Sequence, residues 1–183
     1  DEALPGRTDQ TMPVPAGHYV NDHPLVGPWP DGYETAIFGM GCFWGAEKKF
    51  WQLAGVTDTA VGYQGGSAIR PSYQEVCTGL TGHAEVVKVE YDESIISTRD
   101  ILATFWENHD PTQGNRQGND IGTQYRSTIY WTDEAQEIEV LNTLNEFSVV
   151  LADAGLGPIT TEVGPADQHT FWPAEDYHQK YLQ

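Results

Sequence analysis

The stretch TAIFGMGCFWGAEKKFWQLAG, residues 35–55, forms the beginning of the compact part of the chain. Its first four residues are mostly apolar or β-branched and predict a short strand. Two glycines then allow a sharp turn into a helix that we expect over 43–53. Cys42 therefore stands where a strand passes into a helix. Apolar residues at i, i+4 and i+7 give that helix one buried face: Ala46, Phe50 and Leu53.

Hydrophobic periodicity predicts further elements along the rest of the chain. We expect strands at 57–63, 85–91, 126–131 and 159–163, and helices at 97–109, 132–155 and 173–182. Ser97 or Thr98 is expected to cap the first of these helices, and Thr132 the second. The expected inward residues are Ile101, Leu102 and Phe105 in the first, and Ala135, Ile138, Leu141, Leu144, Phe147 and Leu151 in the second.

This order of elements predicts an α+β fold. Strands and helices mixed in this way favour a single-domain two-layer sandwich, in which helices pack on one mixed β-sheet near a split β-α-β, ferredoxin-like core. We expect this domain to span 34–183. Residues 1–33 are rich in proline, which is excluded from helix interiors, so they are expected to form an irregular N-terminal arm. That arm either is disordered or lies across the domain, and its spaced apolar residues favour the second arrangement.

The composition limits the classes of function. Nine Lys and Arg stand against 27 Asp and Glu among 183 residues, so the formal net charge is −18. Such a surface repels phosphate backbones and anionic lipids, which makes nucleic acid and membranes poor partners. No apolar run approaches the ~20 residues of a membrane-spanning helix. Two cysteines without a Cys-x-x-Cys pair predict neither a disulfide framework nor a zinc site, and they favour a cytoplasmic protein.

Cys42 is the first candidate for catalysis. The first amides of a helix lack internal partners and carry partial positive charge, so a thiol beside them is expected to be stabilised as the nucleophilic thiolate. A buried core cysteine is the alternative. The Gly-x-Cys-x-Gly elbow of hydrolases is excluded, because Met40 and Trp44 occupy its glycine positions. Phe43 and Trp44 either wall an apolar pocket beside the thiol or pack in the core.

Glu85 is the second candidate. Along 85–91, Val87, Val89 and Tyr91 share one strand face, and the same alternation points Glu85 to that apolar side. An ionised carboxylate is costly in such a place, so burial raises its pKa and makes it a proton donor near neutral pH. The alternative is a Glu at a strand end that is half solvated or paired with Lys or Arg.

Tyrosines beside polar loops form the third group of candidates: Tyr63, Tyr73 and Tyr125. Their hydroxyls could donate to an oxygen that gains negative charge, or their rings could fill gaps near the core. Asp120 could orient such a donor or make an Asx turn. The six histidines include no metal-ligand pair, and no glycine fingerprint for a nicotinamide cofactor is present. His83 or His109 could still act as a base toward Cys42.

The motif GCFWG at 41–45 resembles the active-site motif of the A-type peptide methionine sulfoxide reductases. The resemblance continues through GYQGG at 62–66, GHAE at 82–85, WENHDP at 106–111, QGNDIGTQYRS at 117–127 and AEDYHQKYL at 174–182. It covers residues from about 34 to 182, and several ordered motifs at matching separations are far more specific than one. The proline-rich arm lies outside it.

The resemblance implies a reaction and a set of roles. Members reduce the S epimer of methionine sulfoxide, free or within proteins, and so repair proteins under oxidative stress. No metal or organic cofactor is implied, and the external reductant is thioredoxin or another thiol. The matching residues are Cys42 as the nucleophile, Glu85 as the acid that assists the sulfoxide oxygen, Tyr73 and Tyr125 as its hydrogen-bond donors, Asp120 as an acidic residue behind the site, and Phe43 and Trp44 as the walls around the substrate methyl.

The chain departs from the family pattern in the cysteine that recycles the enzyme. Many members carry it in a glycine-rich tail beyond the final Tyr-Leu, and no cysteine follows Leu182 here. Cys77 is the only internal candidate, and we expect it to be structural. The chain as printed is therefore expected to complete one turnover well and to recycle poorly through thioredoxin. We expect it to act as a monomer on oxidised proteins and free methionine sulfoxide.

Two other classes of function stay open on the residues alone. A different cysteine enzyme, such as a thiol peroxidase or an acyl transferase, would use Cys42 but would need neither the methyl pocket nor Glu85. A peptide-binding module would hold methionine-like side chains in an aromatic slot and would need no thiolate.

Overall fold

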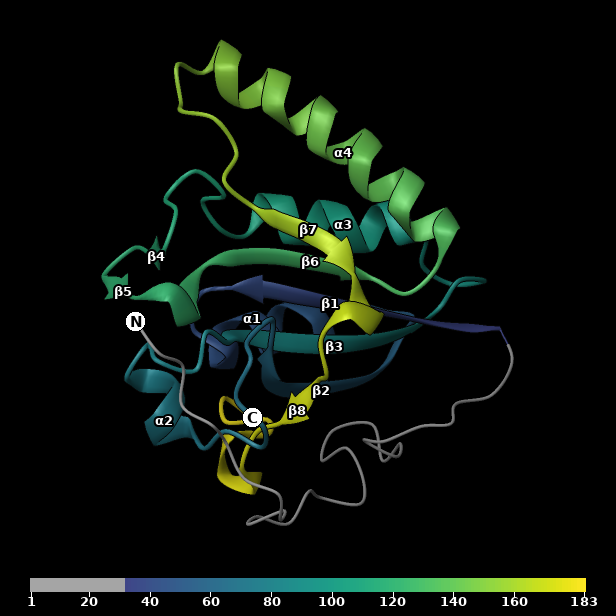
Figure 1. Cartoon of the computed structure of the whole chain (residues 1–183). Coiled ribbons are helices and arrows are strands. Elements are labelled where there is room, and N and C mark those ends of the chain that lie inside the picture. The colour runs from purple at the N-terminus through teal and green to yellow at the C-terminus, as the bar shows by residue number, and fades with distance from the viewer. Residues whose placement is uncertain (1–31) are drawn as a thin grey trace.

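The structure is a computed structural model that describes residues 32–183. A six-stranded mixed sheet runs through its centre (Figure 1). Neighbouring strands are antiparallel, except that β6 and β7 are parallel. Of the predicted arm, 1–33, all but the last two residues lie outside the described part. The order β7-β6-β1-β3-β2-β8 joins β1 (Tyr33–Met40), β2 (Val56–Gln64), β3 (Ala84–Asp92), β6 (Ser127–Trp131), β7 (Glu162–Pro165) and β8 (Trp172–Pro173).

Three helices cover one face of this sheet: α1 (Phe43–Trp51), α3 (Thr98–Glu107) and α4 (Glu134–Asp153). The long α4 runs beside α3 at the top of Figure 1. None of the helices within 32–183 is long and apolar enough to cross a membrane. The packing of the three helices on one face of a mixed sheet confirms the predicted α+β sandwich. Shorter elements are α2 (Tyr73–Cys77), the hairpin of β4 (Arg116–Gln117) and β5 (Asp120–Ile121), and the 3-10 turns η1 (Thr123–Tyr125), η2 (Ala166–Gln168) and η3 (Asp176–His178).

The main core lies between the sheet and these helices. Phe38 of β1 meets Phe50 of α1 and Phe105 of α3, with ring centroids 5.0 and 5.3 Å apart. Fully burying such a side chain contributes roughly 1.5–3 kcal/mol, so this cluster holds α1 and α3 firmly on the sheet. Most of the predicted inward residues of the two helices are buried: Ala46, Phe50, Ile101, Leu102 and Phe105.

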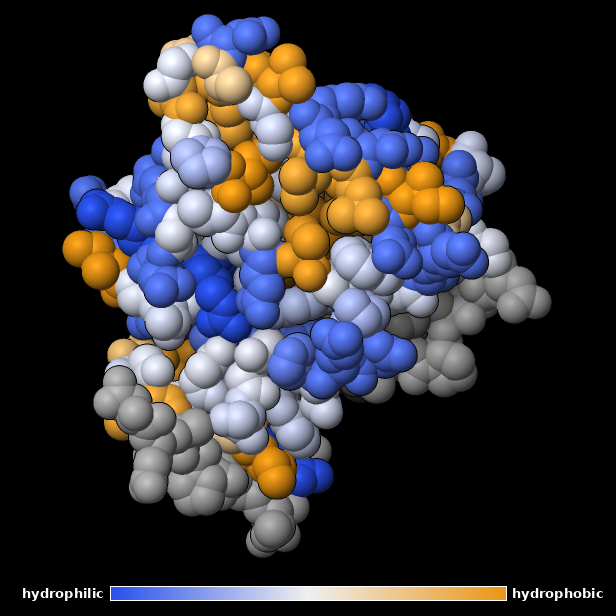
Figure 2. Space-filling model, turned by 45° about the horizontal axis from the view of Figure 1, so that its top comes forward, coloured by the Kyte–Doolittle hydropathy of each residue, from blue (hydrophilic) through white to orange (hydrophobic). Residues whose placement is uncertain are grey.

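The buried face of α4 matches the prediction in its second half but not in its first. Gln136 donates to the Thr35 carbonyl at 2.9 Å, and Thr143 accepts from the Trp106 indole at 3.0 Å. Because polar side chains with fixed partners occupy the buried face of its first half, apolar periodicity pointed there to the wrong side. Figure 2 turns the α4 side forward and shows apolar surface there among polar residues. Ala135, Ile138 and Leu141 are exposed, and Gln136, Val140 and Thr143 are buried in their place. Of the later predicted residues, Leu144 and Phe147 pack against the core and Leu151 is buried.

The predicted helix caps are half right. The Ser97 hydroxyl accepts from the Asp100 amide at 3.1 Å and caps α3, as predicted. Asp133 caps α4 instead of Thr132, and its carboxylate accepts from the helix at 2.8 Å. The Thr132 hydroxyl donates to a β1 carbonyl at 2.6 Å, so it is already used in joining the helix start to the sheet.

The segment 173–182 is not the predicted helix. Its start pairs with β2 as β8, and only Asp176–His178 form a 3-10 turn. The Gln179 amide then accepts from the Val61 N–H and donates to the Val61 carbonyl, both at 2.9 Å, so it continues the sheet edge. Lys180 follows with a positive φ of 55°. These side-chain contacts need a non-helical backbone, and they outweigh helix propensity.

A buried ion pair ties this segment to α1. The Lys180 Nζ lies 2.9 Å from the Glu47 Oε2, and both side chains are 0% exposed. We expect Glu47→Gln to lower the free energy of unfolding by about 3 kcal/mol, because it removes the carboxylate paired with a buried ammonium. Urea unfolding measures the loss. Glu146→Gln removes an exposed partner of Arg99 and should change stability little, so equal losses in the two variants would contradict the prediction.

Candidate active site

Cys42 lies where β1 ends and α1 begins, as predicted. Gly41 before it has a φ of 90°, and a Cβ at Gly41 would lie 2.7 Å from the Gln117 side chain. Glycine is therefore required for the turn. Cys42 is partly exposed, is in no disulfide, and makes no side-chain capping hydrogen bond. Cys42 is therefore partly buried, neither sealed in the core nor freely exposed.

The pKa of the Cys42 thiol does not follow the sequence prediction. Burial raises it above its ordinary value, and the charges of Glu85 and Asp120 act in the same direction. The backbone amides of Trp44 and Gly45 lower it, as the helix start predicts, but they do not outweigh burial. Cys42 is therefore mainly a thiol at neutral pH in this structure. Protonation of Glu85 would remove one of the negative charges that oppose ionisation of the Cys42 thiol.

Glu85 lies 2% exposed on the face of β3 that turns toward the helices, as predicted. Its Oε1 accepts the backbone N–H of Phe43 at 3.1 Å, which places the carboxyl beside the first turn of α1. Burial raises the pKa of Glu85 to about 7, the Phe43 amide lowers it, and Asp120 raises it. A carboxyl that carries its proton near neutral pH can act as a general acid.

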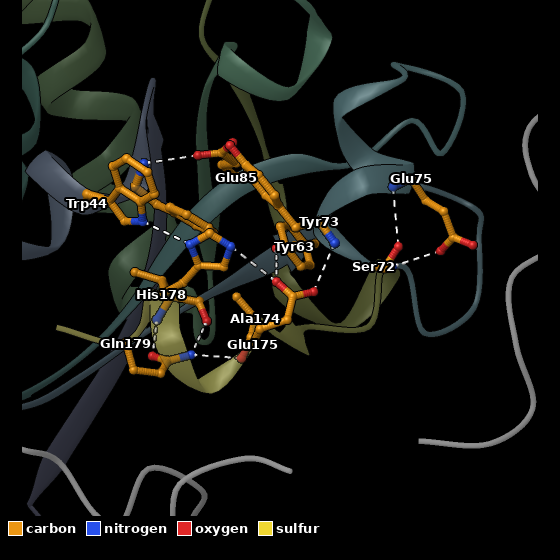
Figure 3. Close-up of polar contacts among 12 residues, drawn as sticks. Trp44, Tyr63, Ser72, Tyr73, Glu75, Glu85, Ala174, Glu175, His178 and Gln179 are labelled. Carbon is orange, nitrogen blue, oxygen red and sulfur yellow. Dashed lines mark hydrogen bonds and ion pairs between the residues drawn. The ribbon is translucent and has the colours of Figure 1, made fainter. Parts of the chain in front are cut away.

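Tyr73 and Tyr125 approach this carboxyl from two connecting segments. Tyr73 begins α2, whose start is fixed by reciprocal hydrogen bonds between Ser72 and Glu75 (3.3 and 2.8 Å). The Tyr73 side chain extends toward Glu85 in Figure 3. Burial raises the pKa of Tyr125 to about 12, and the charges of Glu85, Cys77, Asp120 and Cys42 add to this. Burial raises the pKa of Tyr73 as well. Both phenols therefore keep their protons at neutral pH and can donate hydrogen bonds.

Asp120 lies in the small β4–β5 hairpin, which the sequence patterns did not predict. The residue is exposed, and its negative charge raises the pKa of both Cys42 and Glu85. The Gln117 amide holds this hairpin by accepting from the Asp110 N–H at 3.0 Å and donating to the Asp110 carbonyl at 2.9 Å. The hairpin thus brings negative charge to the side of the thiol.

The aromatic candidates divide between core and site. Phe43 is 1% exposed and packs against Tyr63 at 5.8 Å between ring centroids. Trp44 is partly buried and stacks on Tyr181 at 3.9 Å. Tyr63 is fully buried, and its hydroxyl donates to the Glu175 Oε2 at 2.9 Å. Tyr63 is therefore a core residue, whereas Trp44 is accessible beside Cys42.

Neither candidate histidine is hydrogen-bonded to Cys42 within 32–183. The two ring nitrogens of His109 bond the Phe105 carbonyl and the Ser127 hydroxyl, both at 2.7 Å. His83 is 1% exposed, and its ring nitrogens have no hydrogen-bond partner in the described part of the chain. Burial lowers the pKa of both histidines to about 4. Within residues 32–183, no group of three His, Cys, Asp or Glu side chains could hold a metal ion.

Two buried groups behind the aromatic residues were missed by the sequence patterns. The Trp44 indole donates to the His178 Nδ1 at 2.9 Å, and the His178 Nε2 lies 3.3 Å from the Glu175 Oε2 (Figure 3). The signal available was a Glu and a His three residues apart in a segment that was interpreted as a helix. Cys77 is exposed, and its side chain hydrogen-bonds that of Tyr73.

Comparison with known proteins gives consistent sequence relatives. The family described as peptide methionine sulfoxide reductase matches residues 34–183. The peptide methionine sulfoxide reductase MsrA of Brucella ovis is 56% identical over 182 residues, which cover 100% of this chain and 82% of the relative. The protein of the same name from Brucella anthropi is 58% identical with the same coverage.

Solved structures share the fold. Methionine sulfoxide reductase A of Corynebacterium diphtheriae superposes with a TM-score of 0.92 and is 43% identical, covering 99% of this chain and 87% of its own. Reduced Mxr1 from Saccharomyces cerevisiae has a TM-score of 0.74 and 32% identity, covering 86% and 91%. Mxr1 was also solved in complex with Trx2, and that structure, at 20% identity, shows the shared fold alone. The chain therefore belongs to the peptide methionine sulfoxide reductase family.

Proposed function

We propose that this chain is a peptide-methionine (S)-S-oxide reductase, which reduces the S epimer of methionine sulfoxide, free or in proteins, to methionine. The observation that carries the proposal is the placement of Glu85, a buried carboxyl of raised pKa that accepts the Phe43 amide directly after Cys42. A thiol peroxidase has no need of such a proton donor. The names of the sequence relatives support the same substrate.

Cys42 is the proposed nucleophile. Its sulfur attacks the electrophilic sulfoxide sulfur and forms a sulfur–sulfur bond. The protonated oxygen then moves to the Cys42 sulfur: a Cys42 sulfur–oxygen bond forms while the substrate sulfur–oxygen bond and the sulfur–sulfur bond break. The thioether leaves as methionine, reduced by two electrons, and the Cys42 sulfur is oxidised by two electrons to a sulfenic acid. The proton lost by the thiol balances the proton that the sulfenic acid carries, so the step needs no further reactant.

The remaining residues make the oxygen a better leaving group. Sulfoxide oxygen gains negative charge as the thiolate attacks, and a proton from Glu85 neutralises it. Tyr73 and Tyr125 keep their protons and donate hydrogen bonds to that oxygen. Asp120 is proposed as the acidic residue behind the site, which helps to keep the Glu85 proton in place. Trp44, with Phe43 beneath it, is proposed to hold the substrate methyl group.

A thiol must then reduce the sulfenic acid. We propose a thioredoxin-like reductant, as the complex of yeast Mxr1 with Trx2 suggests for that protein. Cys77 lies exposed beside Tyr73 and is not assigned to this step. The two cysteines are free thiols in the structure, which suits a protein that acts in the reducing cytoplasm. The monomeric state stays a prediction.

A single-turnover experiment tests this function. The reduced protein, mixed with one equivalent of methionine S-sulfoxide and no other thiol, should release one equivalent of methionine. Mass spectrometry should then show one added oxygen atom on Cys42. The R epimer serves as the control and should give no methionine. A protein that leaves the S epimer unreacted would refute the function, and a Cys42–Cys77 disulfide would show that Cys77 recycles the enzyme.

A further inference from the structure

We propose that Glu175 and His178 are positioning residues, which together hold Trp44 and Tyr73 at a fixed separation on the two sides of the substrate slot. The inference rests on the proposed function, since it assigns what fixes the slot for a methyl sulfoxide. Both residues come from the segment after β8, and no step of the proposed reaction uses them.

The link to Trp44 runs through the imidazole. The Trp44 Nε1 donates to the His178 Nδ1 at 2.9 Å, and the His178 Nε2 lies 3.3 Å from the Glu175 Oε2 (Figure 3). An indole N–H can only donate, so the Nδ1 must be unprotonated and accept. The imidazole proton of neutral His178 then sits on the Nε2 and faces the carboxylate. The two neighbours thus select one tautomer of the ring.

The link to Tyr73 runs through the same carboxylate. The Glu175 Oε1 accepts the backbone N–H of Tyr73 at 2.9 Å, at the start of α2. The Glu175 Oε2 also accepts the Tyr63 hydroxyl at 2.9 Å. Tyr63 pairs with Glu85 across β2 and β3, so Glu175 is anchored to the strand that neighbours the proposed acid. The close contact with His178 and the hydrogen bonds from Tyr73 and Tyr63 outweigh burial and lower the pKa of Glu175, which keeps it an acceptor.

The ring of His178 also acts as a spacer. It is 1% exposed and packs against Tyr73 at 4.5 Å and Trp44 at 5.7 Å between ring centroids. On its other side Trp44 stacks on Tyr181 at 3.9 Å. The indole therefore has the Tyr181 ring on one face and the hydrogen bond to His178 at its edge. A displacement of about 1 Å in such a group is enough to lower catalytic efficiency substantially.

Two substitutions separate positioning from simple packing. In His178→Asn the amide oxygen can take the place of the Nδ1 as acceptor for Trp44, whereas His178→Leu offers none. We expect His178→Leu to raise KM for methionine S-sulfoxide about tenfold, with the rate of Cys42 oxidation at saturation changed less than about threefold. His178→Asn should recover most of the lost affinity.

Thr143→Val is the matched control. Thr143 is buried, and its hydroxyl accepts from the Trp106 indole at 3.0 Å, so this variant also deprives an indole N–H of its acceptor. The pair joins α3 and α4, away from the proposed site residues. A loss of stability caused by an indole N–H without an acceptor should also appear in Thr143→Val, but the KM of this variant for methionine S-sulfoxide should not change. A KM rise equal to that of His178→Leu would mean that the effect reflects general destabilisation, and it would overturn the proposal.

A spectroscopic measurement tests the contact without turnover. The indole ¹⁵N–H resonance of Trp44, assigned by its absence in Trp44→Phe, should be protected from hydrogen exchange in the unaltered protein and in His178→Asn. It should exchange faster in His178→Leu. Equal exchange in the two variants, or faster exchange without any rise in KM, would overturn the positioning role. Failure of the unaltered protein to reduce the sulfoxide would instead refute the proposed function, so the two outcomes are distinguishable.

Discussion

Cys42→Ser will abolish the conversion of methyl sulfoxides to thioethers, whereas Cys77→Ser will leave the first turnover nearly intact. A serine hydroxyl ionises far less readily than a thiol and cannot carry the oxygen as a sulfenic acid, so replacement of the nucleophile removes the reaction. Methionine formed per protein molecule, in the absence of added thiol, measures the effect directly.

The Cys77 variant is a demanding control, because the two cysteines receive the same chemical change. Cys77 is exposed in α2, and its side chain bonds that of Tyr73, one of the proposed hydrogen-bond donors. A serine at this position keeps a polar partner for that phenol. Equal loss in both variants would reverse the assignment of the nucleophile, and retained activity in Cys42→Ser would refute thiol chemistry altogether.

Local patterns were enough to predict the centre of the site. The passage from strand to helix at Cys42 followed from apolar residues and two glycines, and the structure places the residue there. The inward orientation of Glu85 followed from its place on the same strand face as Val87, Val89 and Tyr91. Both features depend on residues close in sequence, which is why a single chain reveals them.

Contacts between distant segments could not be predicted in this way. Glu175 and His178 lie more than a hundred residues from Trp44 and Tyr73, with hydrogen bonds that span 134 and 102 positions. The prediction of a helix over 173–182 failed because side chains of this segment form hydrogen bonds and an ion pair with residues of β2 and α1. The pKa of Cys42 was misjudged for a related reason, since burial and the charge of Asp120 come from outside the local helix.

Glu85→Gln will slow the first step by roughly 10²–10⁴-fold, the usual contribution of a general acid. Glutamine keeps the size of the side chain and an oxygen that accepts the Phe43 amide, but it has no proton to give at neutral pH. Quenched-flow measurement of methionine formation isolates this step from recycling. An unchanged rate would reduce Glu85 to a structural partner of α1.

The pH profile of the same step tests whether Glu85 acts as an acid. The productive form is the Cys42 thiolate beside protonated Glu85, whose pKa is about 7. Below pH 7 the acid is in place and the thiolate fraction grows about tenfold per pH unit, so kcat/KM rises. Between 7 and the higher pKa of the thiol, the gain in thiolate is cancelled by the loss of protonated Glu85, so kcat/KM levels off. Above the pKa of the thiol, kcat/KM falls.

In Glu85→Gln the break near pH 7 should disappear, and kcat/KM should rise until the thiol itself is ionised. Because a charge that raises the pKa of Cys42 is also removed, this ionisation should occur at lower pH than in the unaltered protein. The rate of Cys42 alkylation by iodoacetamide against pH measures that pKa independently of the reaction. If the slope of kcat/KM against pH still changes near pH 7 in Glu85→Gln, another group ionises there. Another residue of the site would then have to be the general acid.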